Sequence, residues 1–160
     1  MISLKSILLR KGYVMIKLKE TSTNHFEIKV KINGVKGRFI LDTGASSSCV
    51  GFNEIDYFKL DAQDSAIVAA GAGDSEMETR EALGNKCEIG KWEYSKLNLV
   101  LFNLTHVNTA LKNHGVKTVH GIIGADILKK GKAIIDYNKK RLYLDRKSVV
   151  EGKRVDLGGR

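Results

Sequence analysis

The sequence has 160 residues, 42% of them hydrophobic, and a formal net charge of +9 at pH 7. This length suits one domain with a substantial core and is short for two, and no apolar run approaches the roughly 20 residues that a membrane-spanning helix needs. The basic residues are scattered along predicted strands and turns without interleaved aromatic side chains, so we interpret the charge as a solvated surface and expect no nucleic-acid partner.

The N-terminal segment mixes basic residues with short apolar stretches. Before Gly12, its longest uninterrupted apolar run is Ile7 to Leu9, which is too short for the core of a signal peptide. We predict a short amphipathic helix that Ser3 caps and Gly12 ends, within an N-terminal extension of residues 1–25. A membrane-surface anchor is the alternative, but such anchors usually offer a longer apolar face, so we expect no membrane partner.

Cys49 and Cys87 lack the spacing of metal ligands, and a chain of this length can fold without disulfides. We interpret both as buried free thiols of a protein in a reducing compartment, which predicts a cytoplasmic location. A bridge between the two cysteines is the alternative. The four histidines are dispersed along the chain, so we expect no metal and no other cofactor.

Two strands joined by a tight turn are predicted at the start of the core. Apolar and charged residues alternate over residues 26–32, which is the pattern of a half-buried strand. Asn33-Gly34 is the strongest two-residue signal for a hairpin, and the return strand occupies residues 35–41. This hairpin delivers Asp42-Thr43-Gly44 into a turn.

The rest of the chain predicts many short strands and few helices. We expect strands at residues 49–52, 66–70, 76–82, 86–93, 94–102, 119–123, 133–137 and 141–144, and short helices at 105–113 and 125–129. A glycine-rich tip, Gly71-Ala72-Gly73, joins the second and third of these strands. Because the chain also has no proline and no linker, the pattern indicates one mostly-β domain at residues 26–144, a small closed barrel with one or two short helices.

Residues 145–160, with the sequence DRKSVVEGKRVDLGGR, differ in character from the rest of the chain. They show no hydrophobic period and follow directly on a complete predicted strand. The segment resembles the conceptual translation of a sequencing adapter joined to an open reading frame. We interpret it as a tail that is either non-native or disordered, and we assign it no function.

An acidic tripeptide between apolar flanks carries the main functional signal. Asp42-Thr43-Gly44 follows the apolar run Phe39-Ile40-Leu41, and a lone carboxylate at the end of an apolar strand is costly unless it is paired or used. A second apolar segment, Ile122-Ile123-Gly124-Ala125-Asp126, comes later in the chain. In this order and at this distance, the two segments resemble the retropepsin-like aspartic proteases, and the resemblance covers residues 26–144.

The resemblance implies an acid-protease barrel that hydrolyses peptide bonds with two carboxylates sharing one proton. Because the chain has one Asp-Thr-Gly, the second carboxylate must come from a second copy, which makes the expected enzyme a homodimer with Asp42 from each chain. Thr43 would link the two catalytic loops, and Gly44 would permit the tight turn beside the carboxylate. Ala45 and the tip Gly71-Ala72-Gly73, as a flap, would contact an extended peptide or protein substrate.

Two alternatives concern the role of this segment and its neighbours. Asp126 is a second candidate carboxylate, which we interpret as a structural residue of a helix packed behind the catalytic loop. The alternative function is a non-catalytic peptide-binding or dimerisation module on the same fold. The polar residues Asp74 and Glu76 beside the flap tip favour this module, whereas the retained Asp42 argues against it.

Overall fold

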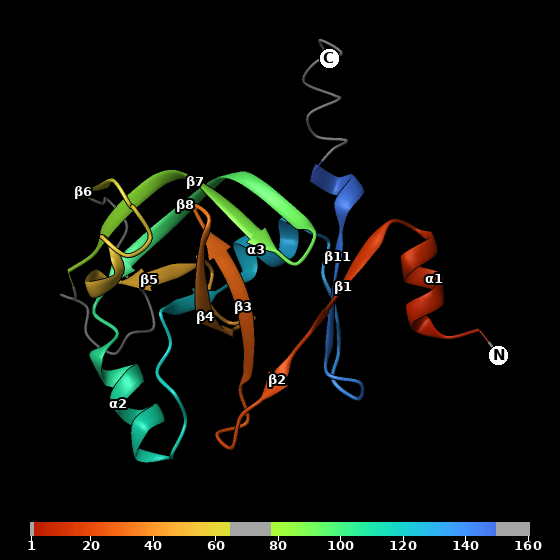
Figure 1. Ribbon diagram of the computed structural model, residues 1–160, viewed down its shortest axis with the longest axis horizontal. Helices are drawn as coiled ribbons and strands as arrows, with labels where there is room; N and C mark the ends of the chain where they lie inside the picture. The colour runs from red at the N-terminus through yellow and green to blue at the C-terminus, as the bar shows by residue number, and fades with distance from the viewer. Residues whose placement is uncertain (1, 65–77, 150–160) are drawn as a thin grey trace, which may run out of the picture.

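The computed structural model of the protein describes residues 2–64 and 78–149. Within these ranges most of the regular secondary structure is strand, arranged in two sheets with short helices at their margins (Figure 1). This arrangement confirms the predicted mostly-β fold. Within the same ranges, every helix is too short or too polar to cross a membrane.

Six strands close into a barrel. In order around the ring they are β3 (Phe26–Ile32), β4 (Val35–Leu41), β9 (Gly121–Ile123), β5 (Cys49–Gly51), β8 (Trp92–Phe102) and β7 (Arg80–Ile89). The pairing of β7 with β3, through Lys31 opposite Glu88 and Ile32 opposite Cys87, closes the ring. Two short strands, β2 (Lys19–Glu20) and β6 (Ala62–Asp64), pair with β3 and β7 outside it. The predicted closed barrel is therefore confirmed.

The hairpin of β3 and β4 forms as its sequence predicts. Phe26 lies opposite Leu41 and Ile32 opposite Val35, so the register holds over the full length of both strands. Asn33 and Gly34 make the turn with φ angles of 51° and 82°, the positive values that a type I′ turn requires. Because alternate residues of β3 are buried in the barrel, the hairpin gives the segment that follows β4 a rigid base.

Strand β1 (Tyr13–Lys17) lies in the N-terminal segment, where the sequence pattern predicts no strand. It pairs antiparallel with β11 (Arg141–Asp145), which also pairs with β10 (Ile134–Asp136), and the three strands form a second sheet beside the barrel. Val14 and Ile16 of β1 belong to the same apolar core as the barrel residues. This part of residues 1–25 is therefore an integral part of the folded structure.

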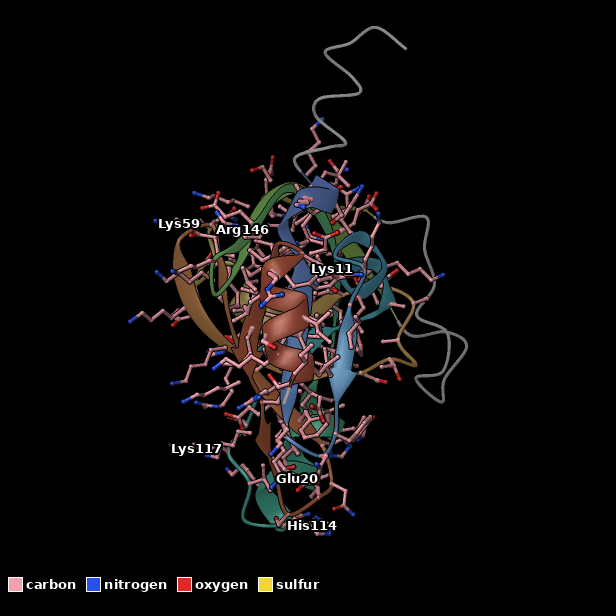
Figure 2. All side chains as sticks on the ribbon, turned by 90° about the vertical axis from the view of Figure 1, so that its right-hand side faces the viewer. Lys11, Glu20, Lys59, His114, Lys117 and Arg146 are labelled. Atoms are coloured by element: carbon pink, nitrogen blue, oxygen red, sulfur yellow. The ribbon has the colours of Figure 1, made fainter. Side chains whose placement is uncertain are left out.

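Helix α1 (Leu4–Arg10) precedes this sheet, and its predicted cap is confirmed. The Ser3 hydroxyl accepts a hydrogen bond from the Ser6 N–H at 3.1 Å, and the Ser6 hydroxyl accepts one from the Ser3 N–H. Gly12 follows the helix with a φ angle of 92°. Figure 2 shows α1 facing the viewer with Lys11 and Arg146 near one end of it, where the Arg146 N–H donates to the Gly12 carbonyl at 3.3 Å.

The wall of the barrel is divided into strands differently from the prediction. The sequence pattern predicts separate strands at residues 76–82 and 86–93, but the single strand β7 runs through residues 80–89. Its register with β8 shifts between Ala82 and Asn85, and Gly84 has a φ angle of 68°, so a β-bulge replaces the predicted break. The strand predicted at residues 66–70 lies outside the described residues.

The remaining elements follow the predicted order. Helices α2 (Thr105–Asn113) and α3 (Ala125–Lys130) confirm the two predicted helices, and a 3₁₀ turn (Phe52–Glu54) follows β5. Strand β11 includes Asp145, and residues 146–149 form a helical turn in which the Ser148 hydroxyl donates to the Lys130 carbonyl at 2.7 Å. The interpretation of the tail beyond them falls on residues outside the described ranges and stays a prediction.

Strand β1 generates the first testable prediction. Ile16 is 9% exposed in the core, whereas the neighbouring Lys17 is exposed to solvent. We expect Ile16→Ala to lower the free energy of unfolding by about 2 kcal/mol or more, through lost burial and a residual cavity. The matched control Lys17→Ala should change it by less than about 0.5 kcal/mol. Urea unfolding measures both, and equal small effects would mean that β1 is not packed as described.

The two cysteines generate a second prediction. Both are free and buried, and burial raises the pKa of each thiol to about 12, so almost no thiolate is present at neutral pH. We expect neither Cys49 nor Cys87 to react with an aromatic disulfide reagent at pH 8 in the native protein, and both to react after unfolding in guanidinium. Rapid labelling of either cysteine in the native protein would contradict this environment.

Candidate active site

The Asp42 loop lies where two parallel strands end side by side. Strand β4 pairs in parallel with β9, with Phe39 opposite Gly121 and Leu41 opposite Ile123. The carboxyl ends of the two strands therefore meet at one edge of the barrel. This pairing brings together the two sequence segments that carry the main functional signal.

The backbone of the loop is fixed, but the Asp42 side chain is open to solvent. The Asp42 N–H donates to the Ile123 carbonyl at 2.9 Å, and the Ala45 N–H donates to the Asp42 carbonyl at 3.2 Å. The Asp42 carboxylate is exposed, and its Oδ1 accepts the Gly44 N–H at 2.8 Å. Among the described residues, Oδ2 has no hydrogen-bond partner. Half of this carboxylate is therefore available to another group or to water.

Two glycines permit the close approach of the backbone at this site. A Cβ atom at Gly44 would lie 3.2 Å from Asp42 Oδ1, closer than ordinary contacts allow. A Cβ atom at Gly124 would lie 2.5 Å from the Ala45 carbonyl oxygen, which accepts the Ala125 N–H at 2.7 Å. A side chain at Gly124 would therefore push the Asp42 loop away from helix α3.

Ser48 and Asp126 form a buried network behind the loop. The Ser48 hydroxyl donates to Asp126 Oδ1 at 2.7 Å, and the Ser48 N–H donates to Oδ2 at 2.9 Å. The same hydroxyl accepts the Gly124 N–H at 2.9 Å, while Asp126 Oδ1 also accepts the Ile127 N–H at 2.8 Å. Both Asp126 oxygens are thus occupied, and the structure gives this residue the structural role that its place in the sequence suggests.

Ser48 is a site residue that sequence reasoning misses. Ser46, Ser47 and Ser48 are adjacent and identical in type, so they read together as loop residues. Only the contact with Asp126, far along the chain, distinguishes Ser48, which is fully buried while Ser46 is exposed. The apolar residues Cys49 and Val50 that follow are the one local sign that the chain enters the core here.

Thr43 lies next to a shallow recess on the same surface. It is exposed, and its hydroxyl has no hydrogen-bond partner within residues 2–64 and 78–149. Thr43 lines a shallow recess of about 340 Å³ together with the apolar residues Leu128, Ala133 and Ile135. The loop therefore adjoins a partly apolar surface, whose lining also includes Lys129 and Lys132.

The structure describes only part of the predicted substrate-binding set. Ala45 is half-buried beside the loop. The tip Gly71-Ala72-Gly73 lies outside the described residues, so its role as a flap stays a prediction. The arms on either side are described, and they pair as an antiparallel hairpin, with Asp64 of β6 opposite Arg80 of β7.

The histidines take packing and surface positions. His120 Nδ1 accepts the Arg38 N–H at 3.0 Å, and the ring stacks on Tyr57 with centroids 5.0 Å apart. Its Nε2 lies 3.9 Å from Glu54. In the part of the chain that the structure describes, no group of three or more metal-ligating side chains comes together.

Comparison with known proteins agrees with this arrangement. Residues 28–127 match the family described as "Aspartyl protease". The comparison with curated protein sequences found no significant match.

Solved structures also resemble the chain. A retropepsin-like aspartic protease from Rickettsia conorii is 20% identical, with a TM-score of 0.52 over 83% of this chain and 90% of its own. The retroviral protease-like domain of Ddi1 from Leishmania major is 17% identical, with a TM-score of 0.51 over 74% of this chain and 86% of its own. The EIAV protease complexed with the inhibitor HBY-793 is 18% identical, with a TM-score of 0.54 over 74% of this chain and 98% of its own. These likenesses confirm the predicted retropepsin-like fold.

The Ser48 network generates a third prediction. Ser48→Ala removes the hydroxyl that joins Asp126 to Gly124 and leaves buried polar groups without that partner. We expect the free energy of unfolding to fall by about 1–3 kcal/mol. The matched control Ser46→Ala, at an exposed position of the same loop, should stay within about 0.5 kcal/mol of the unchanged protein. Urea unfolding measures both variants, and equal free energies of unfolding would mean that the network does not stabilise the loop.

Proposed function

Because this chain belongs to the aspartyl protease family, we propose that it is an aspartic endopeptidase that works as a homodimer with one Asp42 from each chain. The observation that carries the proposal is the difference between two carboxylates at one edge of the barrel. Asp42 is exposed, and one of its oxygens has no partner among the described residues, while both oxygens of Asp126 are held by hydrogen bonds. One protomer thus offers one carboxylate for chemistry, and the second must come from another copy.

The proposed chemistry needs two carboxylates about 3 Å apart, which cannot both be ionised and therefore share one proton. The ionised carboxylate takes a proton from a water molecule, and that water attacks the peptide carbonyl carbon. The neutral carboxylate hydrogen-bonds the carbonyl oxygen and protonates it as the tetrahedral intermediate forms. This mechanism requires no metal, no other cofactor and no covalent intermediate with the enzyme.

The surface around Asp42 supports a two-fold contact at this position. An axis that brings the two Asp42 side chains together also brings the two Thr43 residues together. The Thr43 hydroxyl would donate across the axis to the partner loop, and Gly44 leaves room for that loop. Ala133 and Ile135 of the neighbouring recess, which are half-buried in the protomer, would become more buried in the same contact.

The substrate in this proposal is an extended peptide or a protein segment. It would pair with the enzyme backbone as an added strand, in contact with Ala45 and under the flap tip Gly71-Ala72-Gly73. The catalytic domain would comprise residues 26–144 with β1 packed against it. The two free thiols support a reducing compartment, and we place the enzyme in the cytoplasm.

The fourth prediction tests the shared active site by mixing chains. Asp42→Asn should abolish cleavage of a peptide library, as read by mass spectrometry, while the control Asp61→Asn at an exposed position should retain it. Equal amounts of unchanged and Asp42→Asn chains, refolded together, should then show about one quarter of the activity of the same total amount of unchanged chain. The reason is that about one quarter of randomly formed dimers contain two Asp42 residues.

Each other result of the mixing experiment has a distinct meaning. Half of the full activity would show that each chain works alone, and the two-chain mechanism would be wrong. A stable dimer, seen by its mass in solution, that cleaves no peptide between acid and neutral pH would favour the non-catalytic binding module. Cleavage retained by Asp42→Asn would remove Asp42 from the chemistry altogether.

A further inference from the structure

The outer face of the β3–β4 hairpin carries like charges directly opposite one another. In the register of the two strands, Lys29 lies opposite Arg38 and Lys31 lies opposite Lys36. Opposed like charges destabilise a pair of strands, whereas opposite charges at the same positions would stabilise it. The hairpin therefore carries an arrangement that does not serve its own stability.

Nearby carboxylates compensate only part of this charge. Glu27 lies 3.6 Å from Arg38, and Glu88 lies 3.8 Å from Lys86. Lys29, Lys31 and Lys36 are exposed, and none of them forms an ion pair with another described residue. Lys31 also lies opposite Glu88 of β7, which offsets its charge within the sheet, so Lys29 and Lys36 are the charges left for a partner outside the protomer.

These lysines line a recess of about 560 Å³, which we call the basic recess. Its floor is the outer surface of β7, β3 and β4, and Tyr57 and His120 form one wall. The two rings stack with an interplanar angle of 6°, and the Tyr57 hydroxyl donates to the Lys36 carbonyl at 2.7 Å. The wall is thus attached to the same strand that carries Lys36 and Arg38.

We propose that the basic recess binds an acidic segment of a protein substrate, rich in Asp and Glu, outside the peptide-cleaving site; this role rests on the proposed function. Lys29 and Lys31 are two residues apart on one strand, which places them about 7 Å apart. Alternate side chains of an extended peptide have the same spacing, so carboxylates at every second position would each meet a lysine. Charge-assisted contacts of this kind are stronger than those between neutral groups.

A peptide fits the basic recess better than a nucleic acid does. Sequence-tolerant binding of single strands uses a series of aromatic faces on which successive bases stack. Here the aromatic residues Tyr57 and His120 pack against one another at one wall only.

The basic recess lies within reach of the active site. Arg38 and Asp42 are four residues apart along β4 and the turn after it, which corresponds to about 14 Å in an extended chain. The acidic segment would therefore have to be separated from the cleaved bond by at least about four extended residues. The proposed site thus selects substrates by a feature remote from the cleaved bond.

The test measures binding without cleavage. The full chain carrying Asp42→Asn is titrated against fluorescein-labelled octaglutamate, and fluorescence anisotropy is read at low and at physiological salt. Adding Lys29→Glu and Lys36→Glu should weaken binding at least tenfold. The same two changes turn opposed like charges into opposite charges, so the melting temperature should stay the same or rise by about 2–4 °C.

A matched control separates local from overall charge. Lys117→Glu with Lys139→Glu makes the same change in net charge at exposed positions outside the basic recess. Figure 2 shows Lys117 in the same lower part of the molecule as His114, where α2 lies. This control should change octaglutamate binding less than twofold.

Several outcomes would overturn the proposal. If both pairs of changes weakened octaglutamate binding equally, the net charge of the protein and not the basic recess would explain the binding. Tighter binding of labelled oligothymidylate than of octaglutamate, lost in the Lys29→Glu and Lys36→Glu protein, would make the recess a nucleic-acid site. Binding is measured on the Asp42→Asn chain, so it does not depend on cleavage. Absence of octaglutamate binding would therefore not contradict the proposed proteolysis, and absence of proteolysis would not contradict a measured binding site.

Discussion

The parallel pairing of β4 with β9 is the constraint on which the candidate active site depends. It joins two segments far apart in the sequence at one edge of the barrel, and the hydrogen bonds from Asp42 to Ile123 and from Ala125 to Ala45 continue the pairing past the strand ends. The loop is thus held from both sides of its turn. A reactive group on such a support keeps its position without a ligand, which is the preorganisation that catalysis needs.

The same edge of the barrel shows how surroundings assign different roles to one residue type. Asp126 sits at the first turn of α3 and accepts hydrogen bonds from Ser48 and Ile127. Among the described residues, the side chain of Asp42 accepts one bond, from the Gly44 N–H, and is otherwise exposed. A carboxylate that satisfies several donors stabilises the fold, because its removal would leave those donors without a partner. The division of roles follows from hydrogen bonding and burial alone.

Sequence patterns predict the elements whose determinants are local, and they fail where the determinant is remote. The hairpin of β3 and β4 follows from alternation and from Asn33-Gly34, which act within a few residues. Strand β1 pairs with β11 near the other end of the chain. Its local signal is the alternation of Val14, Ile16 and Leu18 with more polar or flexible residues, which the predicted N-terminal helix leaves unused. The bulge at Gly84 interrupts the alternation of apolar and polar residues along β7, so the sequence pattern predicts a strand break there. Ser48 is set apart from its neighbours only by its contact with Asp126.

The hairpin also shows why stability and recognition can evolve on opposite faces of one element. Ile28 and Val30 of β3 and Phe39 of β4 point into the barrel and are almost completely buried. Burial of such side chains contributes about 1.5–3 kcal/mol each, whereas an opposed pair of like charges costs at most about 1 kcal/mol. The inner face therefore outweighs the cost of the outer one by a wide margin. Lysines at these outer positions cost the fold little stability, so binding of a partner can determine which residues occupy them.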